Sequence, residues 1–153
     1  MILSAYSHPV AEAEVPELSA MPLDVVALLA QAHHPRAGAV VLFSGEVRNH
    51  NNGMDVDYLE YEAHKAMAAK MIKQIIADAH DKFPLNIAVA QHRTGKVIVG
   101  ETAVVVITAS AHRSEAYAAN QYIIDRIKHE ATIWKCEYFS DGTKQWGGNC
   151  SCH

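Results

Sequence analysis

Two mostly apolar runs, residues 38–47 and residues 103–109, constrain the fold of this 153-residue chain more than any other feature. Together they contain seven valine or isoleucine residues. Strands that are covered on both faces have this composition, because neither side of such a strand meets water. Both runs therefore predict buried strands. The second run is the most apolar of the chain, which predicts the central strand of a sheet.

Three segments are predicted to form helices. Between residues 64 and 82, apolar side chains recur with the period of a helix and charged side chains face away. A shorter helix is expected to begin at Pro22 and to stop before Pro35, since the residue before a proline avoids the helical conformation. In the last helix Ser114 is a suitable N-cap, and the apolar stripe comprises Ala116, Ala119, Ile123 and Ile127.

Further strands are expected at residues 2–6, 56–61, 85–91, 96–99 and 132–139. The second of these should return along residues 38–47 as a hairpin with a long loop, because the Asn52-Gly53 pair suits positive φ. Helices are too few to separate every strand, which indicates an α+β fold with a mainly antiparallel sheet and three main helices. We expect one domain over residues 1–146 and a flexible polar tail over residues 147–153.

The net charge of −4 excludes a general nucleic-acid binder, which needs a cationic surface. A local cluster of cations on an acidic protein still suits a small anion. No basic start followed by an apolar run marks a signal peptide, and no apolar stretch has the length of a membrane span. Three cysteines are an odd number and argue against a disulfide framework. These features predict a cytoplasmic protein.

Basic or titratable residues follow three of the predicted apolar strands: Arg48, the pair His92-Arg93 and the pair His112-Arg113. Strand ends are where a scaffold presents side chains to a cleft. The three clusters could therefore converge on an anion such as phosphate, which arginine binds through two parallel hydrogen bonds. The alternative is that strands simply end in polar residues. The sequence alone leaves both interpretations open.

The junction between the last predicted helix and the last strand carries two lysines among apolar neighbours. On spacing alone, Lys128 is best explained as a lysine whose stem covers the core while its amine stays in water. Lys135 is more informative, because alternate residues of a strand share a face. It shares its face with Glu137 and lies opposite Cys136, which we therefore interpret as a core residue and not as a nucleophile.

The tail contains Cys150, Cys152 and His153, which are residue types that bind zinc. A structural zinc site needs four ligands held by folded chain, and a terminal segment after Gly147-Gly148 offers fewer. We therefore favour a flexible end, and we expect no metal and no other cofactor.

An ordered set of short motifs resembles the large, catalytic subunit of molybdopterin synthase. No single motif is decisive, but the order and spacing together are specific, and the resemblance covers roughly residues 38–146. The motifs are Phe43-Ser-Gly-Glu-Val-Arg48 with Asn49-His-Asn, Leu59-Glu-Tyr-Glu62, His92-Arg93-Thr-Gly95, Ser110-Ala-His-Arg113, Asp125-Arg-Ile-Lys128 and Ile133-Trp-Lys-Cys-Glu137.

The resemblance implies an α/β hammerhead fold and a sulfurtransferase of molybdenum cofactor biosynthesis. Members of this family insert two sulfur atoms into cyclic pyranopterin monophosphate, which gives the dithiolene of molybdopterin. The sulfur arrives as a thiocarboxylate on the C-terminal Gly-Gly of a small ubiquitin-like subunit, whose tail enters a pocket of the large subunit. Two large subunits form a central homodimer with a small subunit at each end, so the assembly is a heterotetramer.

The resemblance also implies site residues. Lys128 and Lys135 match two essential lysines, and the expected substrate-binding residues are Arg48, His112, Arg113, Phe43 and Glu137. We expect Lys128 to transfer protons near the carrier tail, and Lys135 to orient the substrate and lower the pKa of Lys128. The reverse assignment stays open. The family's tail can lend an arginine to the neighbouring subunit, and this chain has no arginine after Trp146.

Two other functions are compatible with these residues. One is a non-catalytic module that binds a phosphorylated ligand or a partner's C-terminal tail through the same cations. The other is a metal-binding protein that uses the cysteines and the histidine of the tail.

Removal of residues 149–153 is expected to leave product formation nearly intact, because no assigned site residue lies there. A chelator added to the full chain is likewise expected to change nothing. A truncation that abolishes turnover, or a chelator effect that zinc reverses, would contradict this interpretation of the tail.

Overall fold

The structure is a computed structural model that describes residues 15–147. In this part of the chain there are three helices, α2 (Val25–Gln31), α3 (Lys65–Lys82) and α4 (Arg113–Glu130). The strands are β1 (Leu18–Ser19), β2 (Ala39–Glu46), β3 (His50–Asn51), β4 (Met54–Ala63), β5 (Leu85–Arg93), β6 (Gly95–Ile98), β7 (Thr102–Ser110), β8 (Ile133–Phe139) and β9 (Lys144–Gly147).

Four strands form the first sheet, in the order β1-β5-β7-β2. The strand β7 lies between β5 and β2 and is antiparallel to both, and only the short β1 runs parallel to its neighbour β5. The predicted central strand is therefore confirmed. Its side chains from Ala103 to Ser110 are all buried, as expected for a strand covered on both faces.

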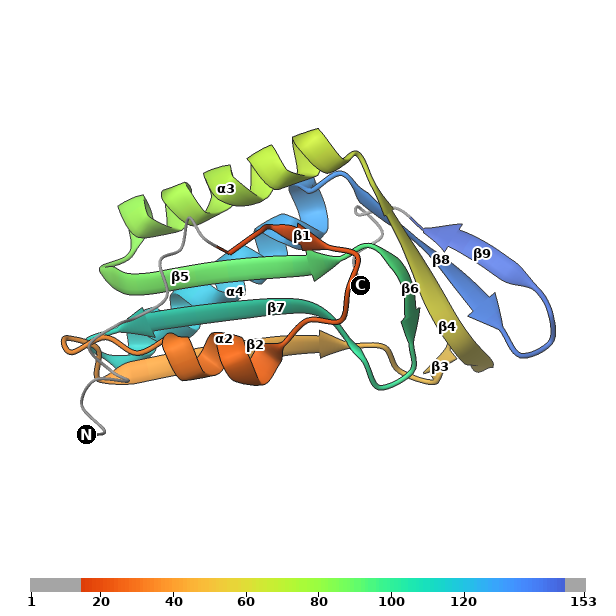
Figure 1. Ribbon diagram of the computed structural model, residues 1–153, viewed down its shortest axis with the longest axis horizontal. Helices are drawn as coiled ribbons and strands as arrows, with labels where there is room; N and C mark the ends of the chain where they lie inside the picture. The colour runs from red at the N-terminus through yellow and green to blue at the C-terminus, as the bar shows by residue number, and fades with distance from the viewer. Residues whose placement is uncertain (1–14, 148–153) are drawn as a thin grey trace.

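The second sheet leans against the end of the first and occupies the right-hand side of Figure 1. Its strands follow the order β3-β4-β8-β9, and β6 also pairs with β4. All of these pairs are antiparallel. The α+β class, the three helices and the mainly antiparallel pairing are thus as expected.

The predicted hairpin between residues 38–47 and 56–61 is wrong. The strand β2 pairs with β7 in the first sheet, with Phe43 opposite Val106, whereas β4 belongs to the second sheet. Asn52 and Gly53 do adopt positive φ, at 52° and 77°, but their turn joins β4 to the two-residue strand β3. The Asn52-Gly53 pair thus forms a turn as predicted, but the turn connects β3 to β4 and not β2 to β4.

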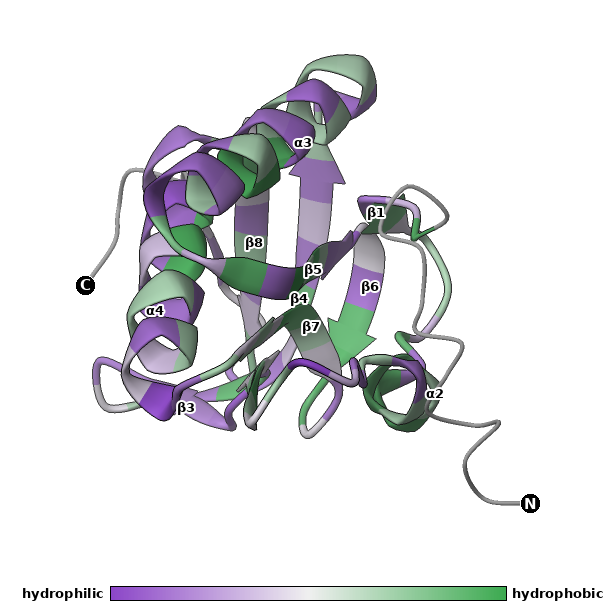
Figure 2. Cartoon of the chain, turned by 90° about the vertical axis from the view of Figure 1, so that its left-hand side faces the viewer, coloured by the Kyte–Doolittle hydropathy of each residue, from purple (hydrophilic) through white to green (hydrophobic). Residues whose placement is uncertain are grey.

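The helices cover the first sheet from both sides. Figure 1 shows α3 and α4 on one side of it and α2 on the other. One apolar cluster joins α3, α4 and the second sheet, and a smaller one joins α2 to β5 and β7. Figure 2 shows the hydrophilic colour on the outer surfaces of α3 and α4. None of the helices within residues 15–147 is long and apolar enough to cross a membrane.

Several element ends differ from the sequence prediction. The residue His112, not Ser114, is the N-cap of α4, and the Ser114 hydroxyl instead donates to Glu115. The helix α2 begins at Val25, because the Asp24 carboxylate caps it by accepting from the backbone N–H of Ala27. A strand that was not expected, β9, pairs with β8 and ends at Gly147, the first residue of the expected tail, whose other residues lie outside the described part of the chain. The predicted strand at residues 2–6 lies outside the described residues.

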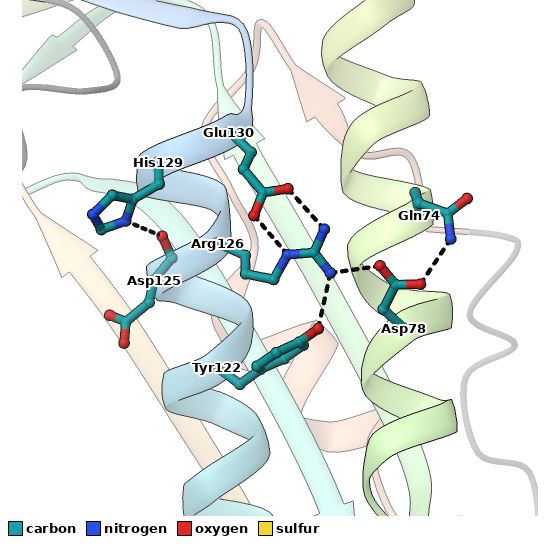
Figure 3. Close-up of polar contacts among 7 residues, drawn as sticks. All are labelled: Gln74, Asp78, Tyr122, Asp125, Arg126, His129 and Glu130. Carbon is teal, nitrogen blue, oxygen red and sulfur yellow. Dashed lines mark hydrogen bonds and ion pairs between the residues drawn. The ribbon is translucent and has the colours of Figure 1, made fainter.

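An arginine network ties the end of α4 to α3, as Figure 3 shows. The Arg126 guanidinium donates to both carboxylate oxygens of Glu130, to Asp78 on α3 and to the Tyr122 hydroxyl. These bonds hold the pKa of Asp78 and of Glu130 below their usual values. The network therefore fixes the last turns of α4, from which Lys128 projects, against the neighbouring helix.

Ile123 tests the packing that positions α4, because it is fully buried between this helix and the sheet. We expect Ile123→Ala to lower the free energy of unfolding by about 2–5 kcal/mol through lost apolar contact and a residual cavity. Urea denaturation measures this. The matched control is Val26→Ala on α2, whose side chain is 80% exposed and whose change should stay within about 0.5 kcal/mol. Equal effects at the two positions would contradict the described packing.

Candidate active site

A cavity of about 280 Å³ lies where the second sheet meets the ends of β2 and α4. It brings together five of the seven residues expected at the site: Phe43, Arg48, Lys128, Lys135 and Glu137. Two segments far apart in the chain build it. The first is the end of β2 with the following loop, and the second is the junction of α4 with β8. The remaining walls are apolar side chains of β4 and β7.

The two lysines reach this cavity from consecutive elements. Lys128 stands in the last turn of α4, and Lys135 is the third residue of β8. Although Lys128 is an exposed residue that lines the cavity, surrounding protein atoms displace part of the hydration of its amine. This desolvation lowers the pKa of Lys128, and the nearby positive charge of Lys135 lowers that pKa further. The site thus makes loss of the proton from Lys128 easier than from an ordinary lysine.

Glu137 is held by an amide rather than by a lysine. The Asn51 Nδ2 donates to both of its carboxylate oxygens, at 2.9 Å and 2.8 Å. The Oδ1 of the same amide accepts from the Arg48 guanidinium at 3.4 Å. The cavity rim therefore contains a chain of hydrogen bonds from Arg48 through Asn51 to Glu137.

Tyr61 lines the cavity, and His92 packs against Tyr61. Their rings meet edge to face, with centroids 4.9 Å apart. Burial, together with the charge of Glu137, raises the pKa of Tyr61 to about 12, so this phenol stays protonated. Burial lowers the pKa of His92 to about 4, and the Lys128 charge contributes in the same direction against the opposing hydrogen bond to Arg93.

The tautomer of His92 follows from its hydrogen bond. Its Nδ1 lies 2.7 Å from the backbone carbonyl oxygen of Arg93. Because a carbonyl only accepts, Nδ1 carries the proton, and Nε2 of the neutral ring is an acceptor. The imidazole of His92 and the phenol of Tyr61 are therefore both neutral and add no charge to the surroundings of the lysine pair.

His112 and Arg113 do not line this cavity, so the basic clusters do not all converge within one chain. Residues 113 and 128 lie at opposite ends of α4, about 22 Å apart at 1.5 Å per residue. The pair instead lines a separate cavity of about 420 Å³ beside Gly38 and Ala39, where β2 begins. The motif was located correctly in the sequence, but the length of the helix separates it from the lysines.

The other basic pair, His92-Arg93, is divided between the two faces of the first sheet. Alternate residues of β5 face opposite sides, so His92 points toward α3 and α4, whereas Arg93 points toward α2. Arg93 is buried, donates to the carbonyl of Lys96 and lies 3.9 Å from Glu101. Of the three basic clusters, only Arg48 lines the lysine cavity, and His92 lies near it as a neutral side chain.

Cys136 is fully buried and lies on the face of β8 opposite Lys135, in agreement with its interpretation as a core residue. Within residues 15–147 no three His, Cys, Asp or Glu side chains are placed to hold a metal ion. The tail residues Cys150, Cys152 and His153 lie outside the described residues.

Sequence reasoning missed Asn51, Tyr61 and the role of His92. Asn51 sits in a turn-rich stretch, where asparagine is expected for its backbone conformation alone. Tyr61 and His92 are regular members of strands. The alternation of β5, with apolar Ala88 and Ala90 on the side of α3 and α4, could have placed His92 on the same side as Lys128.

The fold and the cavity define an α+β protein in which a lysine pair and an arginine line one cavity, an arrangement suited to an anion. Comparisons with known proteins identify its family. The family model described as MoaE protein matches residues 18–130. The chain is 42% identical to a relative from Nostoc sp. over 132 residues, which are 86% of this chain and 80% of the relative. It is 40% identical to a relative from Bacillus subtilis over 133 residues, or 87% of this chain and 84% of the relative.

Both relatives are named molybdopterin synthase catalytic subunit. The crystal structure of molybdopterin synthase from Staphylococcus aureus superposes with a TM-score of 0.81 at 37% sequence identity, covering 86% of this chain and 96% of that chain. The chain belongs to the MoaE family of molybdopterin synthase catalytic subunits. The family, the fold and the enzyme class expected from the motifs are thereby confirmed.

The buried imidazole of His92 should make the folded protein sensitive to acid. In the unfolded chain a histidine binds a proton near pH 6.5, whereas folded His92 does so only at about 4. The contribution of His92 to stability is therefore fully present above pH 6.5, the pKa in the unfolded chain, and is lost as the pH falls toward about 4, the pKa in the folded protein. The pKa difference corresponds to about 3 kcal/mol.

Urea denaturation of the wild type and of His92→Gln at about pH 7 and about pH 4.5 measures this contribution. We expect the wild type to lose more stability between the two conditions than the variant does. Parallel losses would show that His92 does not titrate as its burial implies.

Proposed function

We propose that this chain transfers sulfur from the thiocarboxylated C-terminus of a small ubiquitin-like subunit to cyclic pyranopterin monophosphate, forming the molybdopterin dithiolene. The observation that carries the proposal is the shared cavity of Lys128 and Lys135, in which the pKa of Lys128 is lowered. Both reactants are anions, so cations must hold them. Sulfur addition and loss of water also require a group that exchanges protons near neutral pH.

Lys128 is the proton-transfer residue in this proposal, and Lys135 is the charge that orients the substrate and tunes Lys128. The lowered pKa of Lys128 supports this assignment over the reverse one, because a neutral amine is needed to accept a proton. Arg48 lies at the same cavity and offers a planar guanidinium to a phosphate or carboxylate. Phe43 supplies an apolar wall of the cavity.

The burial of Cys136 supports a sulfur source outside the chain. Its thiol lies on the face of β8 turned away from the lysines, so it has no path to a substrate in the cavity. Within residues 15–147 it is the one free cysteine. A carrier that brings its own sulfur on a flexible C-terminal tail accounts for a sulfurtransferase site without a cysteine.

A second copy of the chain can supply the missing cations. The strand β2 lies at an edge of the first sheet, and an open edge favours pairing with another strand. Beside this edge, Phe43 and Tyr117 are exposed along a hollow between β2 and α4. Two β2 strands related by a twofold axis would run antiparallel, which places the Ala39 end of one beside the Glu46 end of the other.

Such a homodimer would bring the His112-Arg113 cavity of one copy toward the lysine cavity of the other. The reason is that Ala39 lines the former cavity and Glu46 lines the latter. We therefore assign His112 and Arg113 to substrate binding across the homodimer. With a small subunit on each copy, the assembly is a heterotetramer. The cysteine usage suits a reducing compartment, and we place the enzyme in the cytoplasm.

Lys128→Ala is expected to reduce dithiolene formation by roughly 10²–10⁴-fold, the usual contribution of a proton-transfer group. Product is measured with the defined thiocarboxylated carrier and the cyclic precursor. Lys128→Arg keeps the charge but cannot be deprotonated near neutral pH, so it should lose turnover and retain carrier binding. Lys70→Ala, on the exposed face of α3, is the matched lysine control.

Unchanged turnover in Lys128→Ala would exclude the catalytic assignment. If the wild type binds both the carrier and the precursor but forms no product, the chain is a non-catalytic binding module. Full activity in Lys128→Arg would mean that Lys128 acts as a charge alone, and the reverse assignment would then be tested with Lys135→Arg.

A further inference from the structure

Asn51 lies between two side chains of opposite charge at the rim of the lysine cavity. A carboxylate only accepts hydrogen bonds and a guanidinium only donates them, so the two neighbours fix the orientation of the amide. Its nitrogen faces Glu137, with contacts of 2.9 Å and 2.8 Å, and its oxygen faces Arg48. Both oxygens of the Glu137 carboxylate are therefore engaged by one neutral group.

This arrangement is notable because a lysine stands closer to Glu137 along the chain. Lys135 and Glu137 lie on the same face of β8, and residues two apart in a strand have Cα atoms about 7 Å apart. Side chains of this length can close that distance and form an ion pair. Among residues 15–147, however, Glu137 makes no ion pair with either lysine or with Arg48.

The absence of that ion pair matters for the chemistry. A carboxylate in contact with Lys128 would favour the charged amine directly. A carboxylate in contact with Lys135 would offset the positive charge that lowers the pKa of Lys128. Either contact would raise the pKa of Lys128 and so disfavour the neutral amine.

The other charged or titratable groups around Lys128 do not supply a counter-ion in place of Glu137. From β2 and the following loop, Glu46 accepts from the Ser44 hydroxyl, and the Nδ1 of His50 is bonded to the Asn49 side chain. From β4 and β5, Tyr61 and His92 are neutral.

On α4 itself, the Glu130 carboxylate is bound by Arg126, and the imidazole of His129 is bonded to the Asp125 carbonyl. Asp125 lines the hollow beside β2 and does not line the lysine cavity. Glu137 is thus the carboxylate whose position decides the local charge.

We propose that Asn51 is a positioning residue that restrains the Glu137 carboxylate and so keeps the lysine pair without a counter-ion. The neutral amide also separates Glu137 from Arg48, which leaves the guanidinium unpaired for an anionic substrate. This inference rests on the proposed function where it links the charge state of Lys128 to turnover. The restraint itself is a property of the resting protein.

Asn51→Ala removes both hydrogen bonds to Glu137 and frees the carboxylate to reach the lysines. The pKa of Lys128 is measured from the pH dependence of its 13Cε signal, assigned by the loss of that signal in Lys128→Gln. We expect this pKa to rise in Asn51→Ala and to return toward the wild-type value in Asn51→Ala/Glu137→Gln, which lacks the carboxylate charge. Asn49→Ala is the matched control, because its amide lies in the same loop and contacts His50.

The acidic limb of the pH profile of kcat/KM should move with the pKa of Lys128. Below both pKa values, each unit of increase reduces the neutral amine, and hence the rate, by roughly tenfold. An unchanged pKa in Asn51→Ala would overturn the inference, as would a raised pKa that persists in the double variant. If the pKa of Lys128 rises and the rate profile does not follow, the restraint stands and the proton-transfer role of Lys128 fails.

Discussion

The two-residue connection between α4 and β8 sets the geometry of the site. The backbone of Ala131 is bonded back to Ile127, and the carbonyl of Thr132 accepts from the N–H of His64, the N-cap of α3. The connection therefore cannot shift without disturbing both long helices. It fixes the end of a helix that is buried across β7 and β2 against the start of a strand in the second sheet. Lys128 and Lys135 face one cavity because of this turn.

The site places the lysines Lys128 and Lys135 at one cavity, and the nearby carboxylate of Glu137 does not form an ion pair with either of them. Desolvation at the cavity and the proximity of Lys135 both lower the pKa of Lys128, which weakens binding of the proton by the folded protein. Structures usually relieve such a pair with a carboxylate, and Glu137 stands on the correct face of β8 to do so. Because Asn51 binds both oxygens of the Glu137 carboxylate, the positive charge of the lysines has no counter-ion. Unrelieved charge of this kind is common at functional sites, where it is available to a ligand.

Local patterns predicted the features that depend on local structure. Strand alternation separated Lys135 from Cys136, and the apolar run at residues 103–109 identified the central strand. Apart from a few helix ends, the failures concern long-range relations. The partner of β2 could not be read from a turn signal, because Asn52-Gly53 fits any tight connection between two strands. The motif of His112 and Arg113 predicted substrate binding but not their distance from the lysines of the same chain, because an 18-residue helix places them at its far end. Asn51 was hidden for a related reason, since its contact with Glu137 spans 86 residues of sequence.

The central claim is that the neutral amine of Lys128 moves the proton during sulfur transfer. The most direct test compares two curves for the wild-type protein: the NMR titration of Lys128 and the pH dependence of kcat/KM with the thiocarboxylated carrier. We expect the acidic limb of the rate profile to have the same midpoint as the Lys128 titration, and both to lie below the ordinary lysine value of 10.5. A Lys128 that titrates at its ordinary value, while the rate stays independent of its charge, would contradict the account.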